Sequence, residues 1–591
     1  MIARQAVAAD PLLKLTTLKK HPKQEEEKSP AGSSVCSEDG KISSGETSFA
    51  ASFVFVESAP APLLTRHATV IRAPPTDTDD TDEVQVQVFL LNDGEEKQAL
   101  VPKVGSSHSK DKLTTFSLMV TQFRIALFST AQSNANALSI PLPSILDIKS
   151  STGGIDVKLK DCRFYQFYFH SDFDCHKKSS FLKLLSSLVF DMSPSDFFPM
   201  SVRNKAVSPG IYCPARELER WNLVSSCCFT VTKENMNYSL CCTYPKLVIV
   251  PSDLPNSSTL EGASKFRDKG RFPVLSWASN HTGSIWRSAQ PKASLLNRSL
   301  DDEEYLKKAQ VMFIIDCRPM LNAYANIANG AGVEALNNYH SGIELVFAGI
   351  QNIHHVRDSW ENMFCMSQKF FDQTSGPWFS QLETTGWYDH ICSILRASRL
   401  LVDKVKTNIN VLCRCSHGLD RTPQVVSLAM LALDPFYRTI RGFCVLIEKE
   451  WIAMGHKFHS RNCLGRNPSD EFSPIFTQWL ECVFQIISTH PDSFEFKTSF
   501  LLAIQHAMVS GRFGNFLFDC EKDRIEHGIV TVDGSVVQDV WAHLLSRKEK
   551  FINWNFSHRN IEVSDTVLEI DTRVSQIKVW NDLWFSLQRV L

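Results

Sequence analysis

Residues 409–433 constrain the fold of this chain more than any other segment. The apolar run at 409–413 predicts a buried strand, and the run at 425–433, which ends before Asp434-Pro435, predicts a buried helix. Pro423 suits the first turn of such a helix, where a missing N–H breaks no hydrogen bond. A buried strand, a loop and a buried helix in this order indicate an α/β domain with a largely covered sheet.

Strand and helix signals continue to alternate from about residue 200 onward. Further short apolar runs predict buried strands at 246–250, 311–315 and 343–347. Apolar side chains share one helical stripe from Trp387 to Val405, with polar side chains opposite. Later segments read mostly as helix, including 476–487 and 500–508. We therefore expect a central sheet flanked by helices.

Residues 65–192 are rich in strand signals instead. Residues 83–88 alternate polar and apolar side chains, as in a half-buried strand, and β-rich runs follow at 116–128, 137–148, 155–159 and 164–169. The period changes at 177–190, where apolar side chains fall on one helical face. Several strands followed by one amphipathic helix predict a barrel of the pleckstrin-homology type.

The chain has 591 residues, which predicts about two to four domains. Residues 1–60 are expected to form a disordered tail, because they contain too few large apolar side chains to offset the entropy of ordering. We place the β-rich domain at 65–192, the α/β domain at 200–545 and a C-terminal extension at 546–591.

Charge and composition exclude several classes of protein. The 62 basic and 64 acidic residues give a net charge of -2, so the overall basic field of a nucleic-acid-binding protein is absent. We find neither an apolar run of about 18 residues for a membrane span nor a secretory signal. The 17 scattered cysteines lack the paired spacing of zinc sites and suit reduced thiols. These features predict a soluble, cytoplasmic protein.

The loop between the strand and the helix carries the chemistry. It reads Cys415-Ser416-His417-Gly418-Leu419-Asp420-Arg421, with the cysteine and the arginine six positions apart. That spacing alone is a weak signal, but here the loop precedes a helix N-terminus, where free N–H groups and the helix dipole favour an anion. Gly418 allows the backbone to turn sharply and to approach a phosphate closely.

These residue types suit phosphoryl transfer through a cysteine. Cys415 in a positive loop favours the thiolate nucleophile, and Arg421 is able to grip two phosphate oxygens. Asp420 could protonate the leaving oxygen and later orient a water, and either Ser416 or Thr422 could hydrogen-bond the sulfur. This chemistry requires no metal or other cofactor. The alternative is a buried structural thiol with Arg421 as a surface ion-pair partner.

The loop and the segments around it resemble the myotubularin family of phosphoinositide 3-phosphatases. Downstream, the resemblance extends through Tyr437-Arg438-Thr439-Ile440-Arg441-Gly442-Phe443, Glu448-Lys449-Glu450-Trp451 and Gly455-His456-Lys457-Phe458. Upstream, it includes Lys265-Phe266-Arg267, Gly270-Arg271-Phe272-Pro273-Val274-Leu275, Ser288-Ala289-Gln290-Pro291, Asp316-Cys317-Arg318-Pro319 and Asn352-Ile353-His354. It is strongest for the branch of related proteins numbered six to eight and covers about 200–545, and the β-rich region before it is similar to the family's PH-GRAM domain.

The resemblance implies an α/β catalytic domain of the cysteine-phosphatase type, preceded by a β-rich PH-GRAM barrel with a C-terminal helix. It implies hydrolysis of the 3-phosphate of phosphatidylinositol 3-phosphate, and also of the 3,5-bisphosphate, with Cys415 as nucleophile, Asp420 as proton donor and Arg421 as phosphate clamp. The implied substrate-binding residues are Asn326, Asn352, Ile353, Ser416, His417, Gly418, Leu419 and Lys457. For Asn326 and Asn352, capping of a loop is the alternative.

Two positions depart from the family pattern Cys-Ser-Asp-Gly-Trp-Asp-Arg. His417 replaces the first Asp, which should strengthen anion binding but remove an acceptor for inositol hydroxyls, and Leu419 replaces the Trp. We expect weakened or altered catalysis. The competing hypotheses are a headgroup-binding pseudophosphatase that regulates an active myotubularin, and a protein tyrosine phosphatase. Contact with membranes is expected to be peripheral, through phosphoinositides of endosomes or other endomembranes.

Overall fold

A computed structural model of the chain describes residues 85–88, 115–120, 123–129, 138–152, 154–169, 175–201, 203–208, 210–223, 228–254, 257–293, 297–325, 332–370, 378–531, 534–556 and 567–585. The chain divides into two units, residues 1–76 and 77–591, and all described residues belong to the second. The predicted tail at 1–60 therefore lies outside the described residues.

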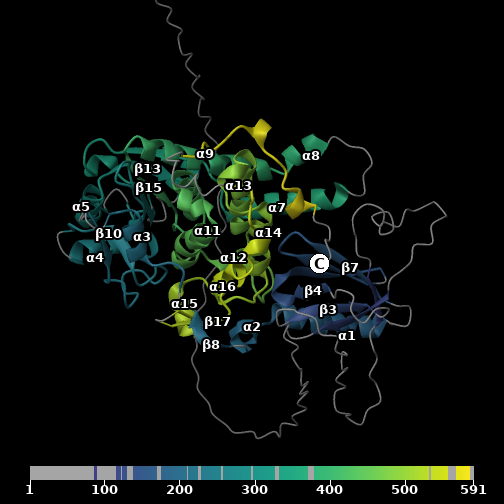
Figure 1. Cartoon of the computed structure of the whole chain (residues 1–591). Helices are drawn as coiled ribbons and strands as arrows, with labels where there is room; N and C mark the ends of the chain where they lie inside the picture. The colour runs from purple at the N-terminus through teal and green to yellow at the C-terminus, as the bar shows by residue number, and fades with distance from the viewer. Residues whose placement is uncertain are drawn as a thin grey trace, which may run out of the picture. The chain divides into compact units, whose positions relative to one another are not determined.

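The N-terminal part of the second unit is a seven-stranded antiparallel sheet with the order β4-β3-β2-β1-β7-β6-β5 (Figure 1). Its strands are β1 (Gln85–Val88), β2 (Thr115–Val120), β3 (Arg124–Ser129), β4 (Leu138–Pro141), β5 (Ile145–Ser151), β6 (Gly154–Leu159) and β7 (Phe164–Phe169). Helix α1 (Cys175–Phe190) follows and buries Leu185 and Val189 against the sheet core. The predicted order of strands and one closing helix is therefore present; the predicted run at 116–128 is two strands, β2 and β3.

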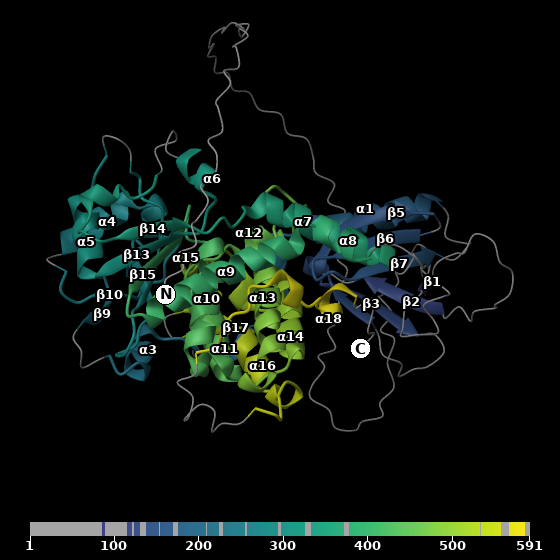
Figure 2. The same ribbon diagram turned by 90° about the horizontal axis from the view of Figure 1, so that it is seen from above.

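The second sheet has five strands in the order β11-β12-β15-β13-β14. They are β11 (Val274–Trp277), β12 (Ile285–Ala289), β13 (Val311–Asp316), β14 (Glu344–Phe347) and β15 (Asn410–Cys415). All neighbours pair in parallel except β11 with β12. Helices α9 (Trp387–Lys406) and α10 (Arg421–Leu433) pack beside β15, as Figure 2 shows. The predicted α/β domain with a sheet and helices is confirmed, and the structure shows that its sheet is mixed.

The remaining elements complete this domain. Smaller sheets pair β9 (Phe229–Thr232) with β10 (Val248–Pro251) and order β16 (Val530–Thr531), β17 (Gly534–Val537) and β8 (Arg203–Ser208). The helices are α2 (Phe198–Ser201), α3 (Pro214–Arg220), α4 (Ser257–Phe266), α5 (Leu300–Lys308), α6 (Met320–Ala325), α7 (Ile353–Phe370), α8 (Trp378–Thr384), α11 (Ile440–Ile447), α12 (Phe458–Asn462), α13 (Ile475–Thr489), α14 (Thr498–Val509), α15 (Glu521–Glu526), α16 (Val540–Leu545) and α18 (Asn581–Trp584).

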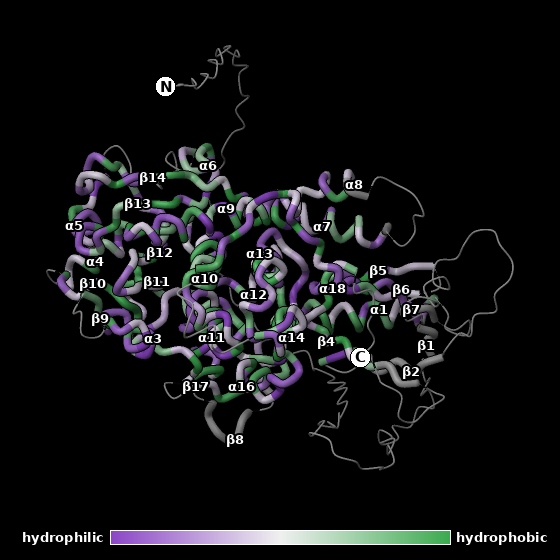
Figure 3. Tube along the Cα trace, turned by 45° about the horizontal axis from the view of Figure 1, so that its top comes forward, coloured by the Kyte–Doolittle hydropathy of each residue, from purple (hydrophilic) through white to green (hydrophobic). Residues whose placement is uncertain are grey.

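Burial follows the predicted hydropathy patterns. The entire apolar stripe of α9, from Trp387 to Val405, is buried, and α10 is apolar along most of its length (Figure 3). The predicted strand at 246–250 forms as β10, but it belongs to the separate sheet with β9 rather than to the central sheet. Strands β11 and β12 were not predicted, because Trp, Arg and Ser interrupt their short apolar runs.

None of the helices that the structure describes is long and apolar enough to cross a bilayer. Within the same residues, no two cysteines form a disulfide.

Glu481 on α13 is buried beneath the C-terminal segment. Its carboxylate accepts hydrogen bonds from Nε1 of Trp387 at 2.7 Å and from Nε1 of Trp584 at 3.1 Å. The two indole rings pack edge to face with their centroids 5.4 Å apart. Burial raises the pKa of Glu481 to about 7, and the hydrogen bonds from Trp387, Tyr388 and Trp584 counter only part of this effect. The titratable side chain of Glu481 therefore connects Trp584, near the end of the chain, to helices α13 and α9.

Because of Glu481, we expect the free energy of unfolding to depend on pH. The pKa of Glu481 is raised from 4.5 to about 7, so the folded protein keeps a proton that the unfolded chain has released. Its contribution to stability is therefore lost as the pH rises through this window. Because glutamine does not ionise, Glu481→Gln should gain about 3 kcal/mol relative to wild type between about pH 5 and about pH 8. Urea unfolding at both pH values measures this gain.

The exposed acid Glu569, which pairs with Arg399, provides the control variant Glu569→Gln. That variant should show no comparable change between the two pH values. A constant difference between Glu481→Gln and wild type at both pH values would contradict the assignment of a buried, proton-binding carboxyl.

Candidate active site

The end of β15 and the start of α10 enclose a loop around the sulfur of Cys415. The side chain of Cys415 is 3% exposed, and the backbone N–H of Gly418 donates a hydrogen bond to its Sγ at 3.2 Å. Gly418 has a φ of +69°, and a Cβ there would lie 2.6 Å from the carbonyl oxygen of Ser288. Only glycine fits this turn, so the predicted need for Gly418 has a direct steric cause.

The guanidinium of Arg421 closes the loop. It donates to the carbonyl oxygen of Ile350 at 3.2 Å and to Oγ of Ser416 at 3.4 Å. Burial raises the pKa of Cys415, but the positive charge of Arg421 and the hydrogen bonds of Thr422 outweigh it, so the pKa of the thiol is lowered. The structure thus places a thiol with a lowered pKa and a guanidinium in one small loop.

Two buried arginines stabilise the backbone of the loop. Arg271 and Arg287 both donate to the carbonyl oxygen of Gly418, at 3.1 and 2.6 Å. Arg287 also pairs with the carboxylate of Glu450 at 2.8 Å. Sequence reasoning assigned no role to these arginines, because arginines on a strand or in a turn are ordinarily exposed. Arg271 lies within one of the quoted family segments and Arg287 directly precedes another, which was the one available signal.

A buried network of charges supports the strand that carries Cys415. It contains Arg267, Asp302, Asp316, Arg318, Glu334 and Arg414, each at most 3% exposed. Arg414 pairs with Asp316 at 2.7 Å and with Glu334, and Glu334 also pairs with Arg267 at 2.7 Å. Because three positive and three negative groups balance, the network holds its charges without leaving one unpaired.

Asp420 is paired in a way that the sequence did not predict. Nε and Nη2 of Arg461 each donate to its carboxylate at 3.0 Å, and Nδ1 of His456 lies 3.4 Å away. Although burial opposes ionisation, Arg461 and His456 hold the pKa of Asp420 well below its usual range. In this arrangement the ionised form of Asp420 is favoured, and its role as a proton donor stays a prediction. Arg461 lies 41 residues after Asp420 in the sequence, and no local pattern pointed to this pair.

His417 also has an unexpected partner. Its Nε2 lies 3.3 Å from Oδ2 of Asp268, and its side chain is 45% exposed. The charge that His417 was expected to add to the anion site is therefore offset by a carboxylate from a distant segment. Leu419, the other departure from the family pattern, is 2% exposed, and its carbonyl oxygen lies 2.9 Å from Nδ1 of His456.

Asn352 caps a helix in the structure. Its Oδ1 accepts hydrogen bonds from the backbone N–H groups of His354 and His355 at 3.0 and 3.2 Å, in the first turn of α7. The carbonyl oxygen of Ile353 accepts from Oγ of Ser473 at 2.8 Å. Asn352 therefore caps the first turn of α7, as the alternative interpretation proposed. Its contact with a headgroup stays a prediction.

Lys457 and Asn326 complete the predicted set. Nζ of Lys457 pairs with Glu471 at 3.1 Å, so its charge is partly neutralised in the structure. Asn326 lies outside the described residues.

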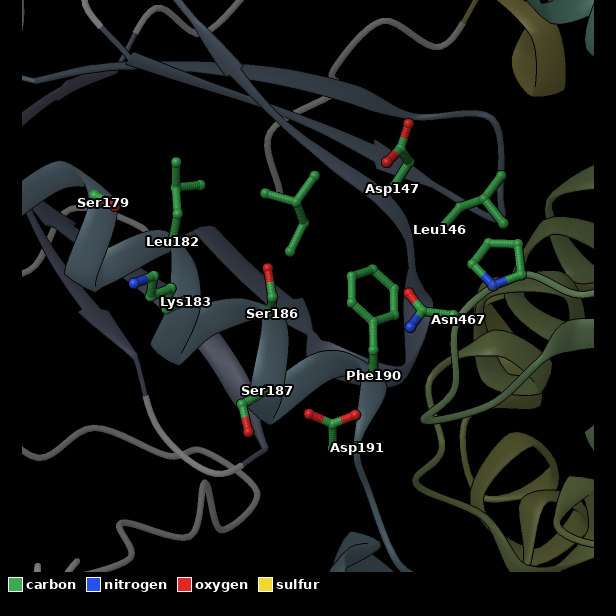
Figure 4. Close-up of a pocket in the computed structure, with 12 residues that line it drawn as sticks. Leu146, Asp147, Ser179, Leu182, Lys183, Ser186, Ser187, Phe190, Asp191 and Asn467 are labelled. Atoms are coloured by element: carbon green, nitrogen blue, oxygen red, sulfur yellow. The ribbon is translucent and has the colours of Figure 1, made fainter.

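A cavity elsewhere in the molecule and the metal-ligating side chains are separate from this loop. A cavity of about 550 Å³ lies between α1, β5 and residues 467–468 and is lined by Asp147, Lys183, Phe190 and Asp191, among others (Figure 4). It contains none of the predicted site residues, and its charges of both signs offer no clear anion site. Among the residues that the structure describes, no group of three His, Cys, Asp or Glu side chains is placed to hold a metal ion.

Comparison with known proteins gives one consistent result. Residues 195–525 match the family described as "Myotubularin-like phosphatase domain". The chain is 38% identical over 420 residues to human phosphatidylinositol-3,5-bisphosphate 3-phosphatase MTMR8, covering 69% of this chain and 58% of that protein. It is 33% identical to human phosphatidylinositol-3,5-bisphosphate 3-phosphatase MTMR6, covering 82% and 78%. It is 34% identical to rat myotubularin, covering 78% of each.

Proposed function

Because this chain belongs to the myotubularin-like phosphatase family, we propose that it removes the 3-phosphate from phosphatidylinositol 3-phosphate and phosphatidylinositol 3,5-bisphosphate. The observation that carries this proposal is the loop itself, in which the Cys415 sulfur accepts the Gly418 N–H beside the charge of Arg421. Phosphate release by the purified protein from short-chain, water-soluble forms of both lipids tests it.

The chemistry proceeds in two steps. The thiolate of Cys415 attacks phosphorus, so that an S–P bond forms while the P–O bond to inositol breaks and the leaving oxygen takes a proton. Water then attacks phosphorus, the S–P bond breaks, and inorganic phosphate leaves with the thiolate restored. Arg421 and the N–H groups of the loop stabilise the charge on the transferred group in both steps.

Asp420 fits the second step better than the first. Its carboxylate is ionised beside Arg461, and an ionised carboxylate orients a water and accepts its proton. Donation of a proton to the leaving oxygen requires the bound headgroup to draw Arg461 away from Asp420, which would raise the pKa of this carboxyl.

The headgroup contacts are assigned to residues around the loop. Ser416, His417, Gly418 and Leu419 surround the reacting phosphate, and Asn326, Asn352 and Ile353 contact the inositol ring. Lys457 neutralises the phosphate that links headgroup and lipid, after separating from Glu471. Oγ of Ser416 already accepts from Arg421, whereas the hydroxyl and the backbone N–H of Thr422 are among the groups that lower the pKa of Cys415, which favours Thr422 as the donor to the sulfur.

The second candidate is a pseudophosphatase that binds headgroups and regulates an active myotubularin. The pairing of Asp420 with Arg461 favours it, because a carboxylate held without a proton slows the first step. Saturable binding of the short-chain lipids without phosphate release would support this candidate, and turnover would exclude it.

We further infer peripheral contact with cytoplasmic faces of endomembranes, with the N-terminal sheet and helix acting as a PH-GRAM domain. Helix α6 supports this contact. It carries no charge and exposes Met320 by 53%, Leu321 by 79% and Tyr324 by 53%. It follows β13, which runs parallel to β15, so it leaves the sheet at the same end as the Cys415 loop. Exposed apolar and aromatic side chains at this end suit the boundary of a bilayer.

Leu321→Asp should therefore weaken activity on vesicles without changing activity on soluble lipid. Loss of a buried Leu side chain at the bilayer predicts a decrease of about tenfold or more in phosphate release from vesicles containing phosphatidylinositol 3-phosphate. Val574→Asp is the matched control, because Val574 is 53% exposed on the C-terminal segment. Equal losses on vesicles and on short-chain lipid would exclude α6 as a membrane contact.

A further inference from the structure

Asp268 is connected to the catalytic loop through the backbone. It begins the 3-10 turn Asp268–Gly270, and its N–H donates to the carbonyl oxygen of Gln290 at 3.0 Å. The N–H of Gln290 in turn donates to the carbonyl oxygen of Ser416, the residue after the nucleophile, at 3.1 Å. Two consecutive hydrogen bonds therefore set the position of Asp268 relative to the loop.

The side chain of Asp268 is held by only one of its two oxygens. Oδ2 lies 3.3 Å from Nε2 of His417 and accepts from Nε2 of Gln290 at 3.3 Å. Gln290 is held in place by Arg318, a member of the buried charge network. Among the described residues Oδ1 has no hydrogen-bond partner, and the Asp268 side chain is 25% exposed. One oxygen is thus anchored, and the other is free to accept.

The charges around Asp268 keep it ionised. Partial burial opposes ionisation, but the hydrogen bond and the charge of His417 outweigh it and lower the pKa of Asp268. A free carboxylate oxygen repels a phosphate but accepts a hydrogen bond from a hydroxyl group. An acceptor of this kind beside a phosphate-binding loop is therefore suited to the hydroxyl groups of a phosphorylated polyol.

Asp420 in the loop is paired with Arg461, and position 417 carries no such acceptor. Position 417 is occupied by His, where active members of the family usually carry Asp, and an acid stands instead at position 268, in contact with that His. We propose that Asp268 replaces the missing loop carboxylate and determines specificity by accepting a hydrogen bond from an inositol hydroxyl, with His417 as the residue that positions it. This inference rests on the proposed function, because it names a further contact in the same pocket.

Two single variants and their double variant test whether a carboxylate at position 268 replaces one at position 417. Asp268→Ala should lower kcat/KM for short-chain phosphatidylinositol 3-phosphate by about tenfold to a hundredfold, mainly through KM, because one charged hydrogen bond is lost. His417→Asp alone should also be harmful, because it replaces the imidazole beside Asp268 with a second carboxylate. The double variant should recover to within about threefold of wild type, since it moves the carboxylate from position 268 to position 417.

Asp253→Ala is the matched control, because Asp253 forms a partly exposed ion pair with Lys308 at 2.9 Å, outside the candidate active site. This control should leave kcat/KM unchanged. The proposal would be overturned if Asp268→Ala left kcat/KM unchanged. It would also be overturned if the fold-decrease in kcat/KM of the double variant equalled the product of the fold-decreases of the two single variants.

Binding measurements separate this inference from the proposed function. Calorimetric titration of the same lipid into Cys415→Ser proteins, with and without Asp268→Ala, reports the contact without any turnover. Absence of phosphate release from wild type would refute the proposed function alone, whereas equal affinities in the titrations would refute the role of Asp268.

Discussion

Replacing Cys415 by serine should abolish phosphate release from both 3-phosphorylated lipids. The loop lowers the pKa of a thiol through the charge of Arg421, but the same surroundings leave a serine hydroxyl protonated near neutral pH. Loss of the nucleophile predicts a decrease in kcat of at least about a thousandfold. A colorimetric assay of inorganic phosphate with the short-chain lipids measures it.

Loss of activity in Cys415→Ser must be distinguished from misfolding. Cys392→Ser replaces another buried cysteine, on α9 and away from the loop, and should keep its activity. The Cys415→Ser protein should still bind the headgroup, because Arg421 and the N–H groups of the loop remain. Release of phosphate by Cys415→Ser at a rate near that of wild type would refute the assignment of the nucleophile.

Replacing Glu334 by alanine should cause the largest loss of stability. Glu334 is 3% exposed, and its carboxylate pairs with Arg267 and Arg414. Burial raises its pKa, but the two guanidinium groups outweigh this and lower the pKa to about 2. Without Glu334 the network has one buried positive charge too many, and breaking such a network costs about 3–5 kcal/mol.

Urea unfolding near neutral pH measures the effect of Glu334→Ala. Glu334→Gln is the informative comparison, because it keeps the volume and some hydrogen bonds while removing the charge, and it should also be strongly destabilised. Glu303→Ala removes an acid that pairs with the exposed Arg298 and should cost about 1 kcal/mol or less. If Glu334→Ala were no less stable than Glu303→Ala, the network would have no role in supporting β15.

The elements with a strong local pattern could be predicted from the sequence. The strand and helix on either side of the Cys415 loop contain apolar runs at 411–413 and 425–433, and the stripe of α9 has the period of a helix, so the residues alone indicate these elements. The sheet to which β10 belongs could not be predicted in this way, because a short apolar run does not specify its partner strand.

The candidate site shows the same division. Cys415, Gly418 and Arg421 lie within one loop, where spacing and helix position carry the information. The contacts of Asp268 with His417 and of Arg461 with Asp420 join segments that are far apart in sequence or belong to different elements. Neither contact has a local signature, so only the folded structure brings these partners together.

The central claim is that the sulfur of Cys415 carries the phosphoryl group during turnover. Rapid acid quenching of the wild-type protein with short-chain phosphatidylinositol 3-phosphate, followed by mass spectrometry of its peptides, tests this most directly. The account predicts a phosphoryl adduct on Cys415 that is absent from Cys415→Ser. Turnover with the phosphoryl group on a different residue, or with no protein adduct at any quench time, would contradict it.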